Sequence, residues 1–230
     1  AFGRWLFPKI GFFWHLYSDP RRRRALQKYG YSHLKELVEI SEKEGITLIP
    51  WAGTLLGFVR DGGFMKHDND VDMAVLPSKS PKEAVDIMVN KYGYQLIQGL
   101  SYHGKVRVCS FMKKGLSVDF YFMFDDGTDF FKQYDFFWKD DFEYNDSRQN
   151  HVGLYSYPRM DKLTTMVLNN IEIKIPANIE EELYYLYGKG WKVPDPNYKG
   201  EGRPGRLGTA DDLGYSMTYD EVINDRIPEA

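Results

Sequence analysis

Aspartates spaced two residues apart are the first feature of this sequence that could carry out chemistry. Asp68, Asp70 and Asp72 alternate with other residues in the segment HDNDVDMAVL, residues 67–76. Side chains two residues apart point to one face of a β-strand, so Asp70 and Asp72 should project together. Two carboxylates on one face repel each other unless a cation lies between them, and hard cations such as Mg²⁺ favour oxygen ligands. The pattern therefore indicates a metal site, with a solvated strand edge as the alternative.

A third acid stands alone in an apolar stretch further along the chain. Asp119 lies within LSVDFYFMF, residues 116–124, which is expected to be a strand. A lone carboxylate among apolar side chains is costly unless something pairs with it. A metal ion bound jointly by Asp70, Asp72 and Asp119 would remove that cost. A turn cap or an exposed strand face would also accommodate Asp119.

A glycine and a threonine precede the aspartates. Gly53-Thr54 lies between an expected strand and a short expected helix. A glycine there allows the backbone to approach a phosphate closely, and the N–H groups at a helix start favour anions. Glycine is also common at such junctions for structural reasons, so this pair supports a phosphate site only together with the aspartates.

These residues need a sheet and helices to hold them, and local patterns predict most of those elements. Asp19 and Pro20 suit the start of a first helix, which Gly45 closes. Lys113-Lys114-Gly115 predicts a hairpin turn between two strands. The remaining expected elements are strands over 46–51, 70–76, 94–98, 105–112, 116–124 and 171–175, and helices over 54–60, 80–92 and 179–187.

Two stretches lack a regular pattern. Residues 128–150 mix aromatic and acidic side chains without a clean period. Residues 197–214 are rich in Gly, Pro, Asp and Arg, and we read them as a loop or an extended tail wrapped on the domain. The sum predicts an α/β (α+β) fold with a mixed β-sheet flanked by helices and an extended C-terminal arm. It also predicts one domain over 1–230, with an N-terminal aromatic arm over 1–18 and a peripheral tail over 197–230.

The composition excludes several classes of function. The 230 residues include 30 basic and 33 acidic side chains, and a net charge of -3 does not indicate a nucleic-acid binder. Cys109 is the single cysteine, which excludes an internal disulfide and a cysteine-based zinc site, and we expect it to be a small buried hydrophobe. No stretch reaches the ~20 apolar residues that span a bilayer. Aromatic residues make up 16%, and their flat faces suit sugars or bases as well as a core.

The N-terminal segment combines aromatic and basic residues. AFGRWLFPKIGFFWHLY, residues 1–17, precedes four consecutive arginines, Arg21 to Arg24. One interpretation is a peripheral membrane contact through residues 1–24, with aromatic rings in the headgroup region and arginines on anionic lipid. The alternative is a docking arm followed by a solvated helix start.

The region around the aspartates resembles the nucleotidyltransferase superfamily, and more narrowly the LicD family of phosphocholine and fukutin-type ribitol-phosphate transferases. The family's Gly-Thr-Leu-Leu-Gly, Arg, Gly and Asp-x-Asp pattern is matched by Gly53, Thr54, Leu55, Leu56, Gly57, Arg60, Gly63, Phe64, Asp68, Asp70 and Asp72. A later block is matched by Ile175, Pro176, Asn178, Glu181, Leu183, Tyr187, Gly188, Trp191 and Pro194. The resemblance spans residues 45–195. His67 and Asn69 depart from the family's Trp-Asp-Asp-Asp run, but Asn69 has the opposite strand parity, so the metal pair is kept.

This resemblance implies a Mg²⁺-dependent or Mn²⁺-dependent phosphotransferase. It would move a phospho-alcohol, of the phosphocholine, ribitol-phosphate or glycerol-phosphate type, from a CDP-linked donor to a sugar hydroxyl in surface-glycan biosynthesis. Asp70, Asp72 and Asp119 would be the catalytic residues and hold one or two metal ions on the donor pyrophosphate. Asp119 would also accept the proton of the acceptor hydroxyl.

The resemblance also assigns the phosphate contacts. Gly53 and Thr54 would hold phosphate oxygens through a backbone N–H and a hydroxyl. Arg60 would make a charge-assisted contact to phosphate through its fork of donors. Asp68 would support the metal site from beside it, or would only begin the strand.

Further residues could line the path of the substrates. Lys105 and Arg107 share a face of an expected neighbouring strand, and they would line a pyrophosphate channel or be ordinary charges on a sheet surface. Trp191 and Tyr187 would stack on the acceptor sugar, or would only pack a helix by its aromatic face.

Two other functions stay open at this point, namely a nucleotidyltransferase acting on a small molecule and a non-catalytic nucleotide- or sugar-binding module. The later block argues against the first, and the intact aspartates argue against the second. The expected partners are a CDP-linked donor and a glycan or glycolipid acceptor, without nucleic acid. Because CDP-linked donors are made in the cytosol, the expected location is the cytoplasm, including the inner membrane face. The Golgi lumen would fit if an upstream anchor had been removed.

Overall fold

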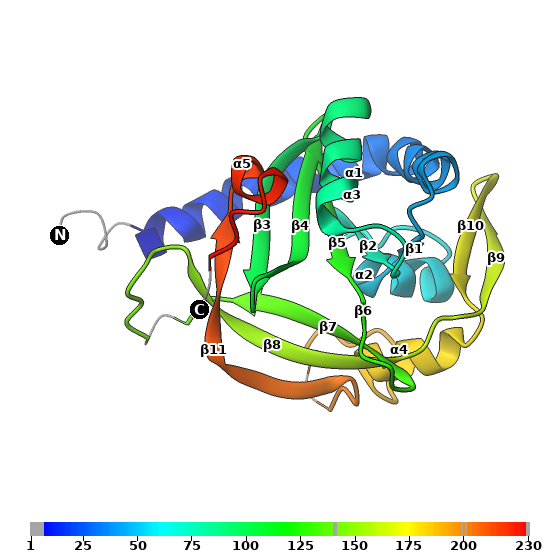
Figure 1. Cartoon of the computed structure of the whole chain (residues 1–230). Helices are drawn as coiled ribbons and strands as arrows, with labels where there is room; N and C mark the ends of the chain where they lie inside the picture. Colours follow the sequence, from blue (N-terminus) through cyan, green and yellow to red (C-terminus); the bar gives the residue numbers. More distant parts are fainter. Residues whose placement is uncertain (1–6, 140–141, 199, 201, 229–230) are drawn as a thin grey trace.

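One long helix and one large sheet make up most of the structure (Figure 1). The computed structural model describes residues 7–139, 142–198, 200 and 202–228, and for residues 7–19 it describes the helical backbone alone. The helices are α1 (Phe7–Glu44), α2 (Ala52–Leu56), α3 (Pro81–Asp86), α4 (Ile179–Tyr187) and α5 (Tyr219–Ile223), with π-helical turns η1 (Gly57–Asp61) and η2 (Ile87–Lys91). The strands are β1 (Leu48–Pro50), β2 (Asp70–Val75), β3 (Gln95–Tyr102), β4 (Lys105–Lys113), β5 (Leu116–Phe122), β6 (Phe124–Asp125), β7 (Phe130–Phe137), β8 (Gln149–Pro158), β9 (Leu163–Leu168), β10 (Ile171–Pro176) and β11 (Arg206–Met217).

Nine of the described strands form one mixed sheet, in the order β1-β2-β5-β4-β3-β11-β8-β7-β6. β2 and β5 are parallel, and the other neighbouring pairs in the sheet are antiparallel. β6 follows β5 directly along the chain yet pairs with β7 at the far edge, so the sheet curls back on itself. In Figure 1, β7 and β8 accordingly run across the direction of β3 and β4. The predicted mixed sheet flanked by helices is confirmed.

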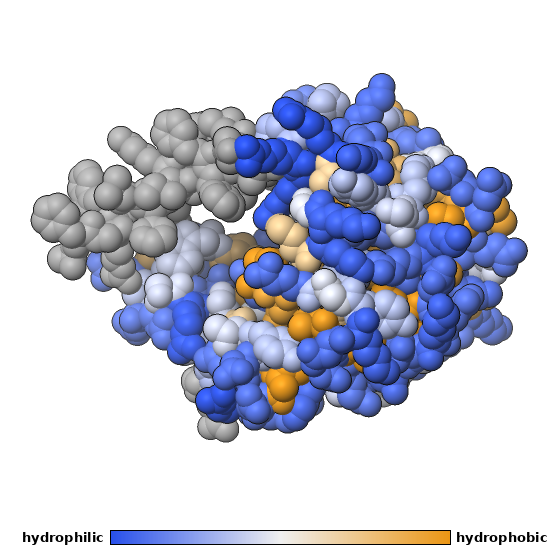
Figure 2. Space-filling model, turned by 90° about the horizontal axis from the view of Figure 1, so that it is seen from above, coloured by the Kyte–Doolittle hydropathy of each residue, from blue (hydrophilic) through white to orange (hydrophobic). Residues whose placement is uncertain are grey.

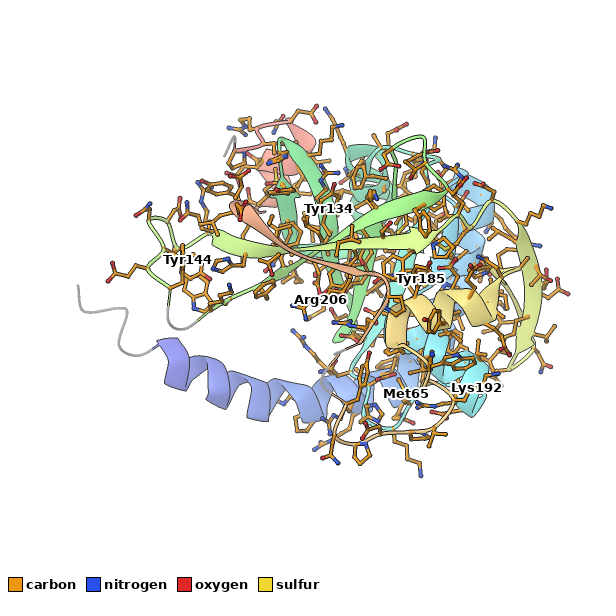
Figure 3. The ribbon with its side chains drawn as sticks, turned by 90° about the horizontal axis from the view of Figure 1, so that it is seen from below. Met65, Tyr134, Tyr144, Tyr185, Lys192 and Arg206 are labelled. Atoms are coloured by element: carbon orange, nitrogen blue, oxygen red, sulfur yellow. The ribbon has the colours of Figure 1, made fainter. Side chains whose placement is uncertain are left out.

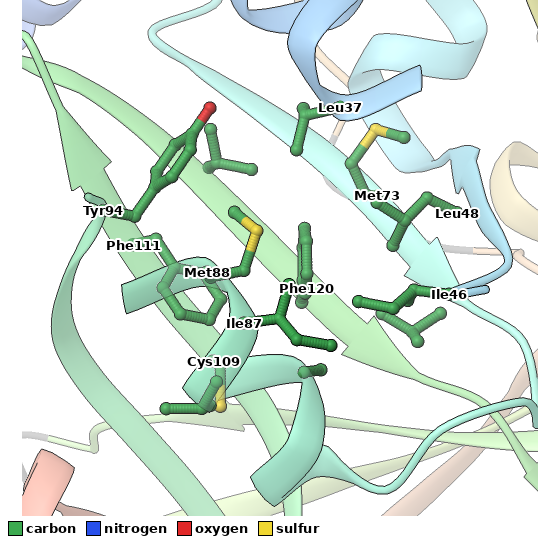
Figure 4. Close-up of a cluster of buried hydrophobic side chains, with 14 of the residues drawn as sticks. Leu37, Ile46, Leu48, Met73, Ile87, Met88, Tyr94, Cys109, Phe111 and Phe120 are labelled. Carbon is green, nitrogen blue, oxygen red and sulfur yellow. The ribbon is translucent and has the colours of Figure 1, made fainter. Parts of the chain in front are cut away.

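Two apolar cores lie on opposite faces of the central strands. On the face toward α1 and η2, Met73 and Phe120 pack with Leu37 in the cluster of Figure 4. On the other face, Ala74 packs in a second core with Trp51. Fully burying a side chain of this size stabilises the fold by roughly 1.5–3 kcal/mol, so each core holds the sheet firmly against its helices.

Local signals placed several boundaries correctly. Gly45, with φ of 67°, follows the last residue of α1, and the left-handed conformation it adopts ends the helix. Lys114 and Gly115 form the turn between β4 and β5, with φ of 52° and 77°. Ser80 caps α3 by accepting the N–H of Glu83 at 3.3 Å, and the Glu83 carboxylate accepts the N–H of Ser80 at 2.9 Å. Cys109 is fully buried, as expected.

The predicted start of the first helix is wrong. α1 begins at Phe7, and Pro20 lies inside it. Asp19 and Pro20 match a helix start locally, but a proline inside a long helix costs one hydrogen bond and some strain, which neighbouring turns can tolerate. Residues 7–18 are therefore helical, and residues 1–6 of the predicted aromatic arm lie outside the described part.

The two later stretches without a regular pattern both contain strands, and the interpretation of residues 197–214 as a loop or tail is wrong for residues 206–214. β7 and the start of β8 lie within 128–150, where apolar residues on both strand faces obscure the alternation, as in FFKQYDFF, residues 130–137. Residues 206–214 belong to β11, which lies between β3 and β8 rather than on the periphery. Its first half is polar and interrupted by two register shifts, so it has no strand-like period.

The described surface is predominantly polar. Figure 2 shows mostly hydrophilic residues on the upper face, with hydrophobic residues in separate spots. Large exposed hydrophobic side chains include Ile97, Trp138, Val167, Val193 and Leu207, which come from five different elements or loops. No helix in the described part of the chain is long and apolar enough to cross a bilayer.

Candidate active site

Three aspartates meet on the face of the sheet that turns away from α1. Asp72 of β2 and Asp119 of β5 are direct partners in the parallel pair, so their side chains leave the sheet side by side. Asp70 lies two residues before Asp72 on the same face. One carboxylate oxygen from each aspartate lies within 4.8 Å of the others, and all three side chains are half-buried. These residues could therefore hold a metal ion, as their spacing predicted.

The protein around the aspartates disfavours their negative charges. Burial raises the pKa of Asp72 well above its usual range, and the charges of Asp70, Asp119 and Asp68 raise it further. Burial likewise raises the pKa of Asp119, although hydrogen bonds from Ser110 and Ser117 oppose the rise. Carboxylates crowded in this way are stabilised by a hard divalent cation, so the donor set fits Mg²⁺ or Mn²⁺.

The segment between β1 and α2 lies against the aspartates. The Trp51 N–H donates to the Asp72 carbonyl at 2.9 Å, and the Asp72 N–H donates to the Thr54 hydroxyl at 3.0 Å. A β-carbon on Gly53 would lie 3.7 Å from both an Asp68 and an Asp72 carboxylate oxygen. The backbone reaches this position with φ of 43° at Ala52, in a region that side chains rarely adopt.

A cleft of about 890 Å³ opens beside this segment. Residues between 53 and 68 form its floor, and residues from the end of α4 and from the segment that leads to β11 form the opposite wall. The lining includes Gly53, Leu56, Arg60, Met65, His67, Asp68, Tyr187, Gly188, Trp191, Val193, Pro194, Tyr198 and Gly202. Figure 3 shows the α4–β11 segment passing near Met65 of the floor, with Lys192 on the same side. The cleft thus brings together residues from the two parts of the sequence, 53–72 and 175–194, that carry the family resemblance.

A protein-family model described as "LicD/FKTN/FKRP, nucleotidyltransferase domain" matches residues 45–178. The chain belongs to this family. A search of curated proteins finds no match to the chain. Membership in the LicD/FKTN/FKRP family implies a transferase that moves phosphoryl-alcohol groups. The matched range contains Asp70, Asp72 and Asp119, whereas Tyr187 and Trp191 lie beyond it.

The residues assigned from the LicD resemblance that line the cleft are Gly53, Arg60, Asp68, Tyr187 and Trp191. The Arg60 guanidinium donates to both oxygens of Asp61, at 2.9 and 2.8 Å. The neighbouring Asp61 therefore already uses two of the hydrogen-bond donors of Arg60. Asp68 has one buried oxygen without a hydrogen-bond partner in the described part of the chain, and burial raises its pKa. His67, at the exposed rim, approaches the other Asp68 oxygen to 3.8 Å.

Lys105 and Arg107 do not line this LicD-family cleft. Lys105 is exposed. The Arg107 guanidinium lies 4.0 Å from the ring centre of Phe124 and 4.2 Å from that of Tyr134, and its Nε donates to the Tyr102 carbonyl at 3.2 Å. These contacts hold the sheet where β7 crosses β4. Their predicted role in a pyrophosphate channel stays a prediction without support from this geometry.

Two arginines near the site were missed. The charge of half-buried Arg22 on α1 helps to lower the pKa of Asp119. Arg203, just before β11, lies near Tyr187 and Tyr198 of the cleft and influences their pKa values. Arg22 was included in a run read as solvated or lipid-binding, and Arg203 in a tail. No local signal separates either arginine from its neighbours, because only the tertiary fold brings Arg22 near Asp119 and Arg203 near the tyrosines of the cleft.

Proposed function

We propose that the chain transfers a phospho-alcohol from a CDP-linked donor to a sugar hydroxyl in surface-glycan biosynthesis. The observation that carries this proposal is the meeting of Asp70, Asp72 and Asp119 beside a large cleft in a LicD/FKTN/FKRP-family chain. The cleft is large enough for a nucleotide-sized ligand, since small-molecule sites measure about 300–1,000 Å³. The grouping of the three aspartates was expected from the sequence, and the cleft was not.

The proposed mechanism assigns a task to each group. Asp70, Asp72 and Asp119 would hold Mg²⁺ or Mn²⁺, which when bound neutralises charge on the phosphoryl group and orients it. The Gly53 backbone lines the cleft without a side chain to obstruct it, and the buried Thr54 hydroxyl accepts the Asp72 N–H and so holds β2 in place instead of reaching the cleft. Arg60 presents positive charge in the cleft. Asp68 would help to orient the site from beside it.

Asp119 is the proposed proton acceptor for the sugar hydroxyl. A carboxylate is a weak base at neutral pH, so a cation bound beside it would have to lower the pKa of the acceptor hydroxyl. Trp191 and Tyr187, on the opposite wall of the cleft from Gly53, would stack on the acceptor sugar and hold its hydroxyl toward the aspartates.

The partners and location follow from this reaction. We propose a CDP-linked donor, a glycan or glycolipid acceptor and a cytoplasmic site of action at the membrane surface. The suggested membrane contact through residues 1–24 falls mainly on residues whose side chains lie outside the described part. Arg21, Arg23 and Arg24, which are described, are exposed on α1 and could meet anionic lipid.

The function is tested by release of CMP from CDP-choline, CDP-glycerol and CDP-ribitol, each with and without Mg²⁺ and with an oligosaccharide acceptor. We expect one donor to yield CMP only when Mg²⁺ and acceptor are both present. Thermal stabilisation by the same compounds measures binding separately from turnover. Failure of every cytidine nucleotide to bind would overturn the proposal. Release of pyrophosphate from CTP or ATP would instead identify a nucleotidyltransferase, and binding without turnover a non-catalytic module.

A further inference from the structure

Arg203 lies beside the cleft, where its direct contacts are to neutral groups and its charge opposes the rise that burial causes in the pKa of nearby Asp135. Its Nε donates to the Gly200 carbonyl at 2.9 Å, and its guanidinium carbon lies 5.5 Å from the ring centre of Tyr155. The side chain is half-buried. No described carboxylate lies within the 4.0 Å of an ion pair with Arg203, in contrast to Arg60, which pairs with Asp61 at 2.8 Å.

The backbone on either side of Arg203 is anchored. The Gly205 N–H donates to the Tyr185 carbonyl at 3.0 Å, and the Ser156 N–H donates to the Gly205 carbonyl at 2.8 Å. A β-carbon on Gly188 would lie 3.0 Å from the Gly202 carbonyl oxygen, which shows how closely the two segments approach. The arginine therefore projects from a point fixed to both α4 and β8.

Tyr187 connects Arg203 to the aspartates. It lines the cleft with Tyr198 and Gly202, which neighbours Arg203 in the chain. Burial raises the pKa of Tyr187, the charges of Asp72 and Asp68 raise it further, and the charge of Arg203 lowers it. Because electrostatic interactions weaken with distance, the Tyr187 ring lies close enough to both the aspartates and Arg203 for their charges to affect its pKa. A substrate beside Tyr187 would lie between them.

We infer that Arg203 binds a phosphate oxygen of the diphosphate substrate, from beside the part of the cleft that Tyr187, Tyr198 and Gly202 line. The guanidinium fork suits phosphate, and its remaining N–H groups are available because Gly200 engages only the Nε in a hydrogen bond. A cation held by the aspartates on one side and a guanidinium on the other would balance the charges of a diphosphate. This inference rests on the proposed function for the identity of the substrate.

The test measures the affinity of inorganic pyrophosphate in the presence of Mg²⁺ by calorimetry. We expect Arg203→Gln to weaken binding about 10- to 100-fold, the typical effect of losing a charge-assisted hydrogen bond. Arg203→Lys, which keeps the charge and loses the fork, should weaken binding less. Arg226→Gln is the matched control, because Arg226 is exposed and pairs with Asp220 at 3.0 Å on α5. It should bind like the unaltered protein.

Thermal unfolding of each variant checks that the fold is intact, and Arg203→Lys supplies the comparison if Arg203→Gln does not fold. Pyrophosphate binding by a folded Arg203 variant within threefold of the unaltered protein would overturn the inference, as would failure of the unaltered protein to bind pyrophosphate. CMP release from CDP-linked donors is measured on the same proteins. If the unaltered protein releases CMP and the Arg203 variants bind pyrophosphate as tightly as it does, the role of Arg203 is rejected and the proposed function is kept.

Discussion

The acidic side chains in the site oppose the stability of the metal-free fold. Asp70, Asp72 and Asp119 place carboxylate oxygens within 4.8 Å of one another, and Asp68 adds to the charge felt by Asp72. Like charges in a partly buried site repel strongly because little water screens them. The residues needed for chemistry thus reduce stability, and a bound cation would restore it.

Replacement of Asp72 with asparagine should separate these two effects. We expect Asp72→Asn to lower turnover at least about 100-fold, which corresponds to ~3 kcal/mol of transition-state stabilisation. Without divalent cations, the same variant should melt at a higher temperature than the unaltered protein, because one repelling charge is gone. Added Mg²⁺ should raise the melting temperature of the unaltered protein more than that of the variant.

CMP release and thermal unfolding with and without Mg²⁺ make these measurements. Asp211→Asn is the control, since Asp211 is exposed on β11 and should leave turnover unchanged. Unchanged turnover in Asp72→Asn would remove Asp72 from the metal site.

Glu182 is a buried acid outside the site. Its side chain is fully buried on α4, and its Oε1 accepts from the Asn178 amide at 3.0 Å. Its Oε2 has no hydrogen-bond partner in the described part of the chain. Burial raises the pKa of Glu182 to about 8. The unfolded chain, with an ordinary glutamate, ionises near pH 4.5, whereas the folded chain keeps its proton to higher pH.

The folding free energy should depend on pH because of Glu182. Its contribution is full below about pH 4.5, falls as pH rises toward 8, and is then constant, with a total loss on the order of 5 kcal/mol. Glu182→Gln cannot ionise and should reduce this slope, so the variant should be more stable than the unaltered protein at pH 8. Urea unfolding between pH 5 and 8 measures the effect. Glu180→Gln is the control, because Glu180 is exposed and pairs with Lys192 at 2.8 Å.

The residues that meet by strand parity could be predicted, and those that meet by tertiary folding could not. Asp70 and Asp72 share a face in any strand, and Asp119 was recognised because an acid in an apolar strand needs a partner. Arg22 and Arg203 carry no such local conflict, so nothing in their surroundings indicated a place near the site. Arg60, predicted to contact phosphate, lines the cleft, and its pairing with Asp61 was not predicted.

At the scale of elements, α2 and η1 pack against the loop that leads to β2. The two short helices meet at Gly57, where the returning loop passes very close. A β-carbon at Gly57 would lie 2.6 Å from the Gly63 carbonyl oxygen and 3.1 Å from Met65 Cγ. The absence of a side chain at Gly57 therefore allows the loop that carries Gly63 and Met65 to pack directly against η1.

Gly57→Ala should displace this loop. We expect a loss of about 1–3 kcal/mol of unfolding free energy, as for other overpacked sites, measured by urea unfolding. Gly190→Ala is the matched control, because a β-carbon at Gly190 would meet nothing within 4 Å. Equal stability of the two variants would show that the loop moves freely and does not constrain η1.

Elements with a clear local period were predicted well, and those without one were missed. The helix over 179–187 lies between Asn178 and Gly188, and the strand over 70–76 alternates aspartates with apolar residues at its start; the structure contains both. β7 carries aromatic residues on both faces because the curled sheet covers both. β11 is exposed and irregular at its start, so its pairing depends on β8 and β3 rather than on its own sequence.

For the whole molecule, β11 connects two parts of one sheet. Residues 215–217 pair with β3, and residues 206–215 pair with β8. Met217 is buried in the same core as Phe120. Without β11, β3 and β8 would each lose the strand to which both are hydrogen-bonded. The part of the sheet that carries the aspartates would then no longer be connected through β11 to β8 and β7.

Removal of β11 should therefore disrupt the fold, contrary to the interpretation of a peripheral tail. A chain ending at Gly205 should lack a cooperative thermal transition by circular dichroism. A chain ending at Met217 loses only α5 and later residues, and it should still unfold cooperatively at a lower temperature because buried Val222 is removed. A cooperative transition in the shorter chain, within a few degrees of the full one, would restore the peripheral interpretation.

The central place of β11 also affects how the protein is made. A ribosome synthesises β3 and β8 well before β11, so each nascent strand has one unpaired edge until residue 217 has left the exit tunnel. Unpaired strand edges recruit other chains and promote aggregation. The sheet should consequently close after most of the chain has been translated, and slower elongation or a holding chaperone should raise the soluble yield.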